Sequence, residues 1–436
     1  SSHALHRTNI LLARRIANPI KIKYLYMPRP KVLYISYDGL TDPLGQSQIL
    51  PYVTELSRQG FSFVLLSCEK IDAYNKNKGL IEKLLEGIDV EWEPIFYTKK
   101  PPVLSTLYDY WRLKRKAISL HQSNKFRLVH CRSYIPSMIG LWLKKKFQVK
   151  FVFDMRGFWA DERVDGGHWN LRNIIYKSVY SFFKMKEKAF LENADHIISL
   201  TLAGKKEIDS WGHIKKRPLP ISIIPCCVDA DLFDPEKIEA EKIQEARHDL
   251  GIEANEPVLT YLGSIGTWYL LDEMLAFFVV YLNKFPNAKF LFISQDNSDF
   301  IYSKARVAGV PTDRMIVVSS GRASVPVYAS IGNYSIFFIK PSFSKKSSSP
   351  TKQGELMALG VPVICNAGVG DTDMIVKKYE SGLIVNSLNE SNYQEIVEKI
   401  GTISFDPDKI RKGALNYFSL QIAVSKYNNI YSSLLN

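Results

Sequence analysis

Apolar runs that predict β-strands alternate with segments of helical periodicity in the first half of the chain. The run KVLYIS at 31–36 is followed by a loop that contains Gly45, and FSFVLLSCE at 61–69 is a second strand-like run. Between them lies a segment with apolar residues at helical spacing: Ile49, Leu50, Val53 and Leu56. A strand, a glycine-containing loop, a helix and a strand are typical of a doubly wound α/β domain with a parallel sheet.

The same alternation continues to about residue 200. Four more runs predict strands: VEWEPIFY (90–97), RLVHCRS (127–133), KFVFDMRGFW (150–159) and HIISLT (196–201). Helical segments lie at 104–122 and 173–195, and the aromatic stripe of the second is typical of core packing. No GxGxxG sequence follows a strand, so the pattern does not indicate a dinucleotide-binding domain.

A second domain is predicted after the proline-containing passage at 217–235, which has the character of a linker. A strand, a turn at 263–266 and a helix follow in PVLTYLGSIGTWYLLDEML, and three further strand-like runs extend to Lys340. We therefore predict a basic extension or leader at 1–30 and Rossmann-like domains at 31–218 and 219–412. A helical segment at 413–436 ends the chain.

The segment from Lys340 to Asp373 carries the most distinctive chemistry. A Ser- and Lys-rich loop precedes a short helix from about Gly354, an apolar strand and the turn AGVGD, after which another helix is predicted at Asp371. Helix N-termini attract anions through free N–H groups and the helix dipole, and four lysines add positive charge: Lys340, Lys345, Lys346 and Lys352. Glu355 offers an acceptor for sugar hydroxyls. The alternative is an ordinary solvated connection.

Composition and charge narrow the choice of partner. Hydrophobic residues make up 46% of the chain, the longest apolar run (274–282) is too short to span a bilayer, and no secretory signal is evident. The five scattered cysteines lack metal-ligand spacing and are expected to be reduced thiols. Residues 1–220 carry 37 Lys and Arg against 20 Asp and Glu, whereas residues 221–436 carry 20 against 24. Such asymmetry predicts an anionic partner for the first domain.

Nucleic acid, an anionic membrane and a phosphorylated acceptor all fit that charge. The segments at 108–116 and 142–150 place Arg and Lys beside Trp and Tyr, a combination that can bind lipid headgroups or single-stranded nucleic acid. No RNA-binding or helix-turn-helix motif is recognisable, which favours the membrane and argues against nucleic acid. Two strand ends of the first domain carry groups that could contact an acceptor: His130, Arg132, Ser133, Asp154, Arg156, Trp159, Asp161, Glu162 and Arg163. A loop closed by salt bridges is the alternative.

Several of these sequences resemble one family. GELMALGVPVICNAGVGDTDMIV (354–376) resembles the donor-binding segment of retaining glycosyltransferases of family 4, and IPCCVDADLFDP (224–235) resembles the family's interdomain signature. The family has two glutamates eight positions apart. Glu355 matches the second, which holds the nucleotide ribose, whereas Ser347 replaces the first. Lys352 precedes the helix, as in a branch of the family that reads SPTK-x-GE.

The resemblance implies further site residues. Gly45 lies where the family places a glycine loop against the donor sugar, and Arg156 matches a position after a strand where relatives have histidine. His130 matches an H-x-H-like strand end. The turn at Gly263 and Ser264 lacks the arginine and lysine of many relatives, so that backbone N–H groups, Arg322, Lys340 and Lys352 would carry the diphosphate. The donor residues would also include Ser347, Gly368, Gly370 and Asp371, and the catalytic ones Lys352, Glu355, Arg156 and His130.

The implied fold is α/β of the GT-B type, with two facing Rossmann-like domains and a last helix that crosses back to the first. The implied reaction is retaining transfer from a UDP- or GDP-linked sugar, without a cofactor or a metal. Charge predicts a lipid-diphosphate-linked glycan acceptor and a peripheral, cytoplasmic position at the inner face of a bacterial membrane, in polysaccharide or glycoprotein glycan assembly. A nucleotide-sugar epimerase of the same fold and a non-catalytic protein that binds anionic surfaces are the alternatives.

Overall fold

A sheet of seven parallel strands forms the centre of the first domain, in the order β3-β2-β1-β4-β5-β6-β7. The computed structural model describes residues 29–98, 101 and 104–436. The strands are β1 (Lys31–Ser36), β2 (Ser62–Glu69), β3 (Val90–Phe96), β4 (Leu128–Arg132), β5 (Lys150–Asp154), β6 (His196–Ser199) and β7 (Ile221–Ile223). The order reverses between β1 and β4, which places their carboxyl ends where such sheets bind ligands.

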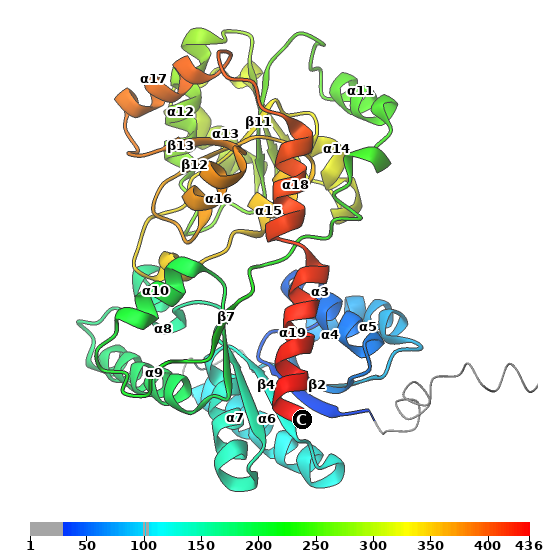
Figure 1. Ribbon diagram of the computed structural model, residues 1–436. Coiled ribbons are helices and arrows are strands. Elements are labelled where there is room, and N and C mark those ends of the chain that lie inside the picture. The colour runs from blue at the N-terminus through cyan, green and yellow to red at the C-terminus, as the bar shows by residue number, and fades with distance from the viewer. Residues whose placement is uncertain (1–28, 99–100, 102–103) are drawn as a thin grey trace, which may run out of the picture.

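Helices cover both faces of this sheet (Figure 1). One face packs against α6 (Leu104–Asn124), α7 (Tyr134–Phe147) and α9 (Ile174–Asn193), through residues such as Leu113, Ile139 and Phe190. The other face packs against α4 (Leu50–Arg58), α5 (Ile71–Leu85) and the last helix, α19 (Leu420–Leu435). Three shorter helices follow strands at the carboxyl edge: α3 (Pro43–Gln48), α8 (Trp159–Asp165) and α10 (Leu202–Ser210).

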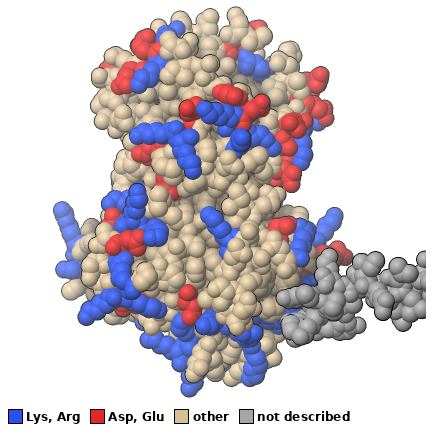
Figure 2. All heavy atoms as spheres, in the orientation of Figure 1, with Lys and Arg blue, Asp and Glu red and all other residues tan. Residues whose placement is uncertain are grey.

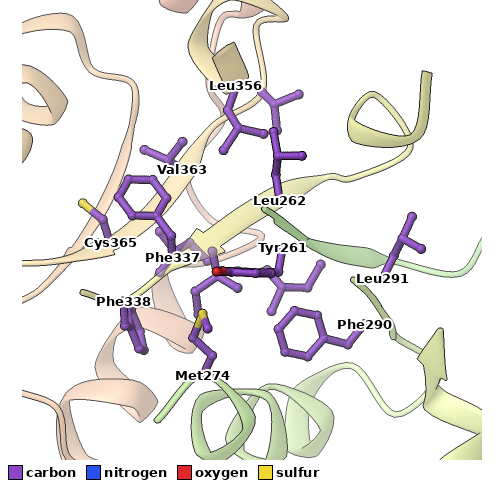
Figure 3. Packing of buried hydrophobic residues seen from close by; sticks show 14 of the residues in the cluster. Tyr261, Leu262, Met274, Phe290, Leu291, Phe337, Phe338, Leu356, Val363 and Cys365 are labelled. Atoms are coloured by element: carbon purple, nitrogen blue, oxygen red, sulfur yellow. The ribbon is translucent and has the colours of Figure 1, made fainter. Parts of the chain in front are cut away.

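The second domain has a six-stranded parallel sheet in the order β10-β9-β8-β11-β12-β13. Its strands are β8 (Val258–Leu262), β9 (Lys289–Ile293), β10 (Met315–Val318), β11 (Tyr334–Phe337), β12 (Val363–Asn366) and β13 (Gly382–Val385). Its helices are α11 (Ala240–Asp249), α12 (Leu271–Lys284), α13 (Ser298–Val307), α14 (Val325–Ala329), α15 (Thr351–Ala358), α16 (Thr372–Tyr379), α17 (Glu390–Lys399) and α18 (Pro407–Tyr417). Figure 3 shows Tyr261 at the centre of the apolar side chains that these elements bury.

The C-terminal segment connects the two domains. α18 packs against α15 in the second domain, and α19 continues down the first domain beside α4 (Figure 1). Between them, Phe418 is fully buried and Ser419 forms a bridge with Val228 of the linker. On α19, the buried residues Tyr427 and Tyr431 pack on the strands of the first sheet. The end of the chain therefore forms part of the first domain's core.

The predicted pair of doubly wound parallel sheets is confirmed. One helix boundary differs, because α15 begins at Thr351 rather than about Gly354: Pro350, whose ring fixes φ at −68°, serves as its N-cap. The basic extension predicted at 1–30 lies, up to residue 28, outside the described residues. Among the helices of the described ranges, none is both long enough and apolar enough to span a bilayer.

Candidate functional site

Lys352 lies at the start of α15, inside a cage of aromatic rings. Its Nζ is 3.1 Å from the Tyr261 hydroxyl oxygen and 3.5 Å from the centre of the Tyr269 ring. A Cβ on Gly263 would stand 3.2 Å from the same Nζ, and Gly263 has a φ of +110°, so that this position favours glycine for both space and backbone conformation. The ammonium group is thus aimed at the turn that follows β8.

Burial sets the charge of this lysine. Loss of water around the ammonium group lowers the pKa of Lys352 well below its usual value, and the carboxylates of Glu355 and Asp296 only partly oppose this effect. An anion that enters the site would supply the missing negative charge and raise the pKa again. A bound phosphate would therefore favour the charged form of Lys352.

Glu355 lies one turn further along α15 and is paired with an arginine. Its Oε1 is 2.6 Å from a guanidinium nitrogen of Arg322, which is half exposed and stacks over the Phe233 ring at 4.8 Å. Arg322 follows β10 in sequence and α15 follows β11, so the pair joins segments that come after two different strands of the sheet. The carboxylate keeps acceptor capacity for hydroxyl groups, because a carboxylate has about four lone-pair sites.

The turn after β8 completes this cluster. Ser264 accepts a hydrogen bond from the Tyr261 hydroxyl through its carbonyl oxygen (2.6 Å), and Asp296 accepts one from the Ile265 N–H. The structure thus brings together five of the predicted site residues: Gly263, Ser264, Arg322, Lys352 and Glu355. A buried amine, a guanidinium group and a glycine turn can hold a diphosphate, and a carboxylate beside them can hold a sugar ring.

Asp371 lies elsewhere and joins the two domains. Its carboxylate accepts hydrogen bonds from the N–H groups of Leu202 (2.6 Å) and Ala203 (2.9 Å), the first residues of α10 in the other domain. The Tyr417 hydroxyl donates a third bond of 2.7 Å to it. The Asp371 carboxylate therefore caps a helix of the first domain. We call this contact the Asp371 clasp. That Asp371 contacts the donor stays a prediction.

The lysine-rich loop also contacts the first domain. Lys345 pairs with Glu162 at 2.8 Å, and Lys346 pairs with Glu207 at the same distance. Lys340 donates to the Asp165 carbonyl oxygen at 3.4 Å. Lys345 and Lys346 are thus bound by carboxylates of α8 and α10, whereas Lys340 contacts a backbone carbonyl oxygen of α8. That Lys340 contacts the diphosphate stays a prediction.

Three more residues of the 340–373 segment were predicted to bind the donor. Ser347 is buried, and its hydroxyl oxygen would stand 2.8 Å from a Cβ on Gly204, in the first turn of α10. Gly370 has φ +50° and a Cβ there would lie 2.0 Å from the Ser348 carbonyl oxygen, so Gly370 is packed within the protein. Gly368 has φ +85° and more space, with its nearest neighbour, the Pro341 Cβ, 3.9 Å from such a Cβ. Of these three positions, only Gly368 has room beside it.

His130 lies in the core of the first domain, which differs from the predicted contact with an acceptor. Its ring stacks on Tyr34 with centroids 4.4 Å apart, its Nδ1 lies 2.6 Å from the Tyr431 hydroxyl of α19, and its Nε2 faces Asp154 at 3.4 Å. The imidazole is 1% exposed. The C-terminal helix therefore seals His130 from the surface, and the residue serves to pack α19 on the sheet.

Arg156 and Gly45 also differ from their predicted roles. The buried Arg156 has φ +54° and its guanidinium group lies 3.3 Å from the Cys226 sulfur, so it faces the linker between the domains. A Cβ on Gly45 would stand 2.1 Å from the Gly39 carbonyl oxygen. The close approach that Gly45 permits is thus within its own loop, which the buried Glu69 fixes by accepting from the Leu40 and Thr41 N–H groups.

The burial of His130 predicts a pH dependence of stability. Burial lowers the pKa of His130, with Asp154 opposing, so the folded state holds this ring neutral while the unfolded state protonates it near pH ~6.5. The free energy of unfolding should therefore fall as the pH drops below that value. The free energy of unfolding is measured by denaturant titration at pH 7 and at pH 5. The decrease from pH 7 to pH 5 should be smaller in His130→Gln than in the wild type. An equal loss would contradict this, since His121 and His196, whose pKa values burial also lowers, are present in both proteins.

Sequence reasoning missed the residues that complete these contacts. Tyr261 and Tyr269 form the cage of Lys352. Tyr261 lies inside an apolar strand, where a tyrosine is usually interpreted as part of the core. Trp268 stacks under the Lys345 ammonium group at 3.7 Å, and a Cβ on Gly166 of the first domain would lie 2.9 Å from its ring. A tyrosine one residue before the end of β8 and two before a glycine turn was the available signal for the cage.

Comparisons with known proteins bear on the family and the fold. Residues 49–232, most of the first domain, match the family model described as Glycosyltransferase Family 4. The predicted resemblance to family 4 glycosyltransferases is confirmed. No match was found among curated proteins.

Solved structures of glycosyltransferases share both domains of this chain. Sucrose-phosphate synthase from Thermosynechococcus elongatus is 17% identical to this chain, with a TM-score of 0.68. The match covers 93% of this chain and 99% of the synthase chain. A glycosyltransferase from Rickettsia africae is 16% identical, with a TM-score of 0.69, and the match covers 94% of this chain and 100% of that one. HepE from Anabaena, solved with UDP-glucose, is 13% identical, with a TM-score of 0.67, and the match covers 92% of this chain and 99% of the HepE chain. The predicted GT-B fold is thereby confirmed.

Proposed function

We propose that this protein transfers a sugar from a nucleoside diphosphate donor to a glycan acceptor. The observation that carries the proposal is the cluster of Lys352, Gly263, Glu355 and Arg322 at the carboxyl edge of the second sheet. Cationic, N–H and carboxylate groups meet there, as a diphosphate joined to a sugar and a ribose requires. HepE, which shares the fold, binds UDP and UDP-glucose, and this supports a UDP- or GDP-linked donor.

The residues have distinct roles in this proposal. The diphosphate lies against the turn at Gly263, where the Lys352 ammonium group neutralises the charge that grows on the leaving phosphate. Glu355 accepts hydrogen bonds from ribose hydroxyls, and Arg322 moves from Glu355 to the diphosphate or remains beside it. The acceptor hydroxyl attacks on the face that the nucleotide leaves, and the departing phosphate takes its proton, so the configuration is retained and no metal is needed.

The first domain presents the acceptor. At its carboxyl edge, Asp38 is 43% exposed and accepts a hydrogen bond from the buried Arg132 Nε at 3.2 Å, which holds the carboxylate toward the surface. We assign Asp38 to acceptor hydroxyls. The basic first domain supports a glycan carried on a lipid diphosphate, at the inner face of a bacterial membrane, in the assembly of polysaccharide or glycoprotein glycans.

Nucleotide binding and turnover test the proposal in two steps. UDP or GDP at 100 times its Kd should stabilise the protein by about 2.7 kcal/mol, measured as a rise in Tm, whereas adenosine should not. A panel of nucleotide sugars is then incubated with and without lipid-linked glycans. Release of nucleotide only with an acceptor supports transfer, and an altered sugar from donor alone would show an epimerase instead. A protein stabilised by none of the nucleotides would overturn the proposal in favour of a non-catalytic role.

A further inference from the structure

Helix α6 exposes a continuous apolar stripe. Leu104, Leu107, Tyr108 and Trp111 recur at the spacing of one helix face, and each is between 54 and 64% exposed. The opposite side of the same helix is packed on the sheet through Leu113, Ala117 and Leu120. Large apolar side chains gathered on one exposed face mark an interaction site more often than scattered ones do.

A second stripe lies on α9, which covers the same face of the sheet. Ile174, Ile175, Phe182 and Met185 are between 41 and 78% exposed, while Phe183 and Phe190 point into the core. α7 packs between α6 and α9. The two stripes therefore belong to one helical layer of the first domain.

Cations of the same two helices flank both stripes. Arg112 lies over the Tyr108 ring at 5.4 Å, Arg115 over Trp111 at 5.5 Å, and Lys186 over Phe182 at 5.2 Å. The sequence has one acid within 104–124 and 171–186, Asp109, which is fully buried and accepts from the Tyr37 hydroxyl and the Thr98 N–H. In Figure 2, Lys and Arg side chains gather along the edge and base of the lower lobe, which is the first domain.

The stripes lie toward the second domain. Helices that connect parallel strands run opposite to them, so the N-terminal halves of α6 and α9 lie near the carboxyl edge of the sheet. The stripe of α6 lies in this half, at 104–111, and the stripe of α9 begins in it, at 174, and extends to 185. The same edge carries Asp38, the residue assigned to the acceptor, and its partner Arg132.

We propose that the stripes of α6 and α9 dock this protein on an anionic lipid bilayer. Apolar side chains would enter the boundary between headgroups and acyl chains, while the flanking Arg and Lys contact lipid phosphates. A second copy of this chain fits less well, because it would place cations against cations around the same stripes. Docking holds the carboxyl edge beside the bilayer, where a lipid-linked acceptor is found; this orientation, though not the binding itself, rests on the proposed function.

Vesicle flotation tests the surface. Vesicles of phosphatidylcholine with one lipid in three replaced by phosphatidylglycerol should bind the full chain, and salt should weaken the binding. Leu107→Ser with Trp111→Ser, and separately Ile174→Ser with Ile175→Ser, should each lower the partition coefficient by ~10-fold or more. The matched control is Phe300→Ser with Val307→Ser, which removes two exposed apolar side chains from α13 of the second domain and should change nothing.

Three further readouts decide the interpretation. Brominated lipids should quench the emission of the wild type more than that of Trp111→Phe, which locates Trp111 in the bilayer. Unchanged flotation of both double variants would overturn the proposal, and so would a dimer in the wild type that these variants convert to monomers. Thermal stabilisation by UDP or GDP is measured without vesicles, so failure of docking and failure of the donor site are distinguished.

Discussion

Replacing Lys352 by methionine should lower kcat/KM for sugar transfer by ~10²–10³-fold. Methionine keeps most of the volume inside the cage of Tyr261 and Tyr269 but removes the amine that is aimed at the turn of Gly263. The loss should appear in kcat as well as in KM, because charge on the leaving diphosphate grows toward the transition state. Lys399→Met, at an exposed lysine of α17, is the control and should remain within a factor of two or so of the wild type.

The pH dependence of donor binding gives a second readout of the same residue. The pKa of Lys352 is lowered by burial, and a bound diphosphate would raise it, so binding takes up a proton between the two values. The affinity for a nucleotide sugar, whose phosphates do not titrate in this range, should therefore fall as the pH rises through that window. Calorimetry in buffers of different ionisation enthalpy measures the proton directly. Equal proton uptake by the wild type and Lys352→Met would remove this lysine from the donor site.

The spacing of apolar residues and the positions of the strand ends predicted the contacts that lie within one domain. Gly263, Arg322, Lys352 and Glu355 each follow a strand or begin a helix, and parallel strands bring their carboxyl ends to one edge, so their meeting could be predicted. The aromatic cage was not predicted, since the only signal was the place of Tyr261 near the end of an apolar strand, where a tyrosine is usually interpreted as part of the core. A buried lysine was equally unexpected, because lysines in polar loops are normally solvated.

Contacts between distant parts of the chain account for the side-chain partners that the sequence did not predict. His130 is sealed by Tyr431, which lies 301 positions later, and Asp371 reaches Leu202, 169 positions earlier. Local patterns carry no information on such pairs. The glycine turn and lysine loop of 340–373 do have anion-binding chemistry, but the first domain supplies the negative groups, from Glu162 and Glu207, that occupy two of its lysines.

Removing the carboxylate of Asp371 should shift the two domains toward an open arrangement. In the structure this side chain accepts two charge-assisted hydrogen bonds across the domain boundary, from the Leu202 and Ala203 N–H groups, and Tyr417 holds it in place. Burial, with Asp371 adding to it, raises the pKa of Tyr417, so its hydroxyl stays protonated and donates. Loss of the two bonds in Asp371→Ala costs about 3 kcal/mol, which corresponds to ~10²-fold in the ratio of closed to open molecules.

Small-angle scattering and kinetics together test the Asp371 clasp. Asp371→Ala should increase the radius of gyration and lower kcat, because transfer requires the acceptor edge of the first domain to face Lys352 and Glu355. Donor affinity should change less, since these two residues lie in the second domain alone. Asp373→Asn, which alters a first-turn acid of the same helix but forms no bond across the boundary in the described residues, is the matched control. A compact Asp371→Ala with normal kcat would show that the lysine pairs with Glu162 and Glu207, rather than Asp371, hold the domains together.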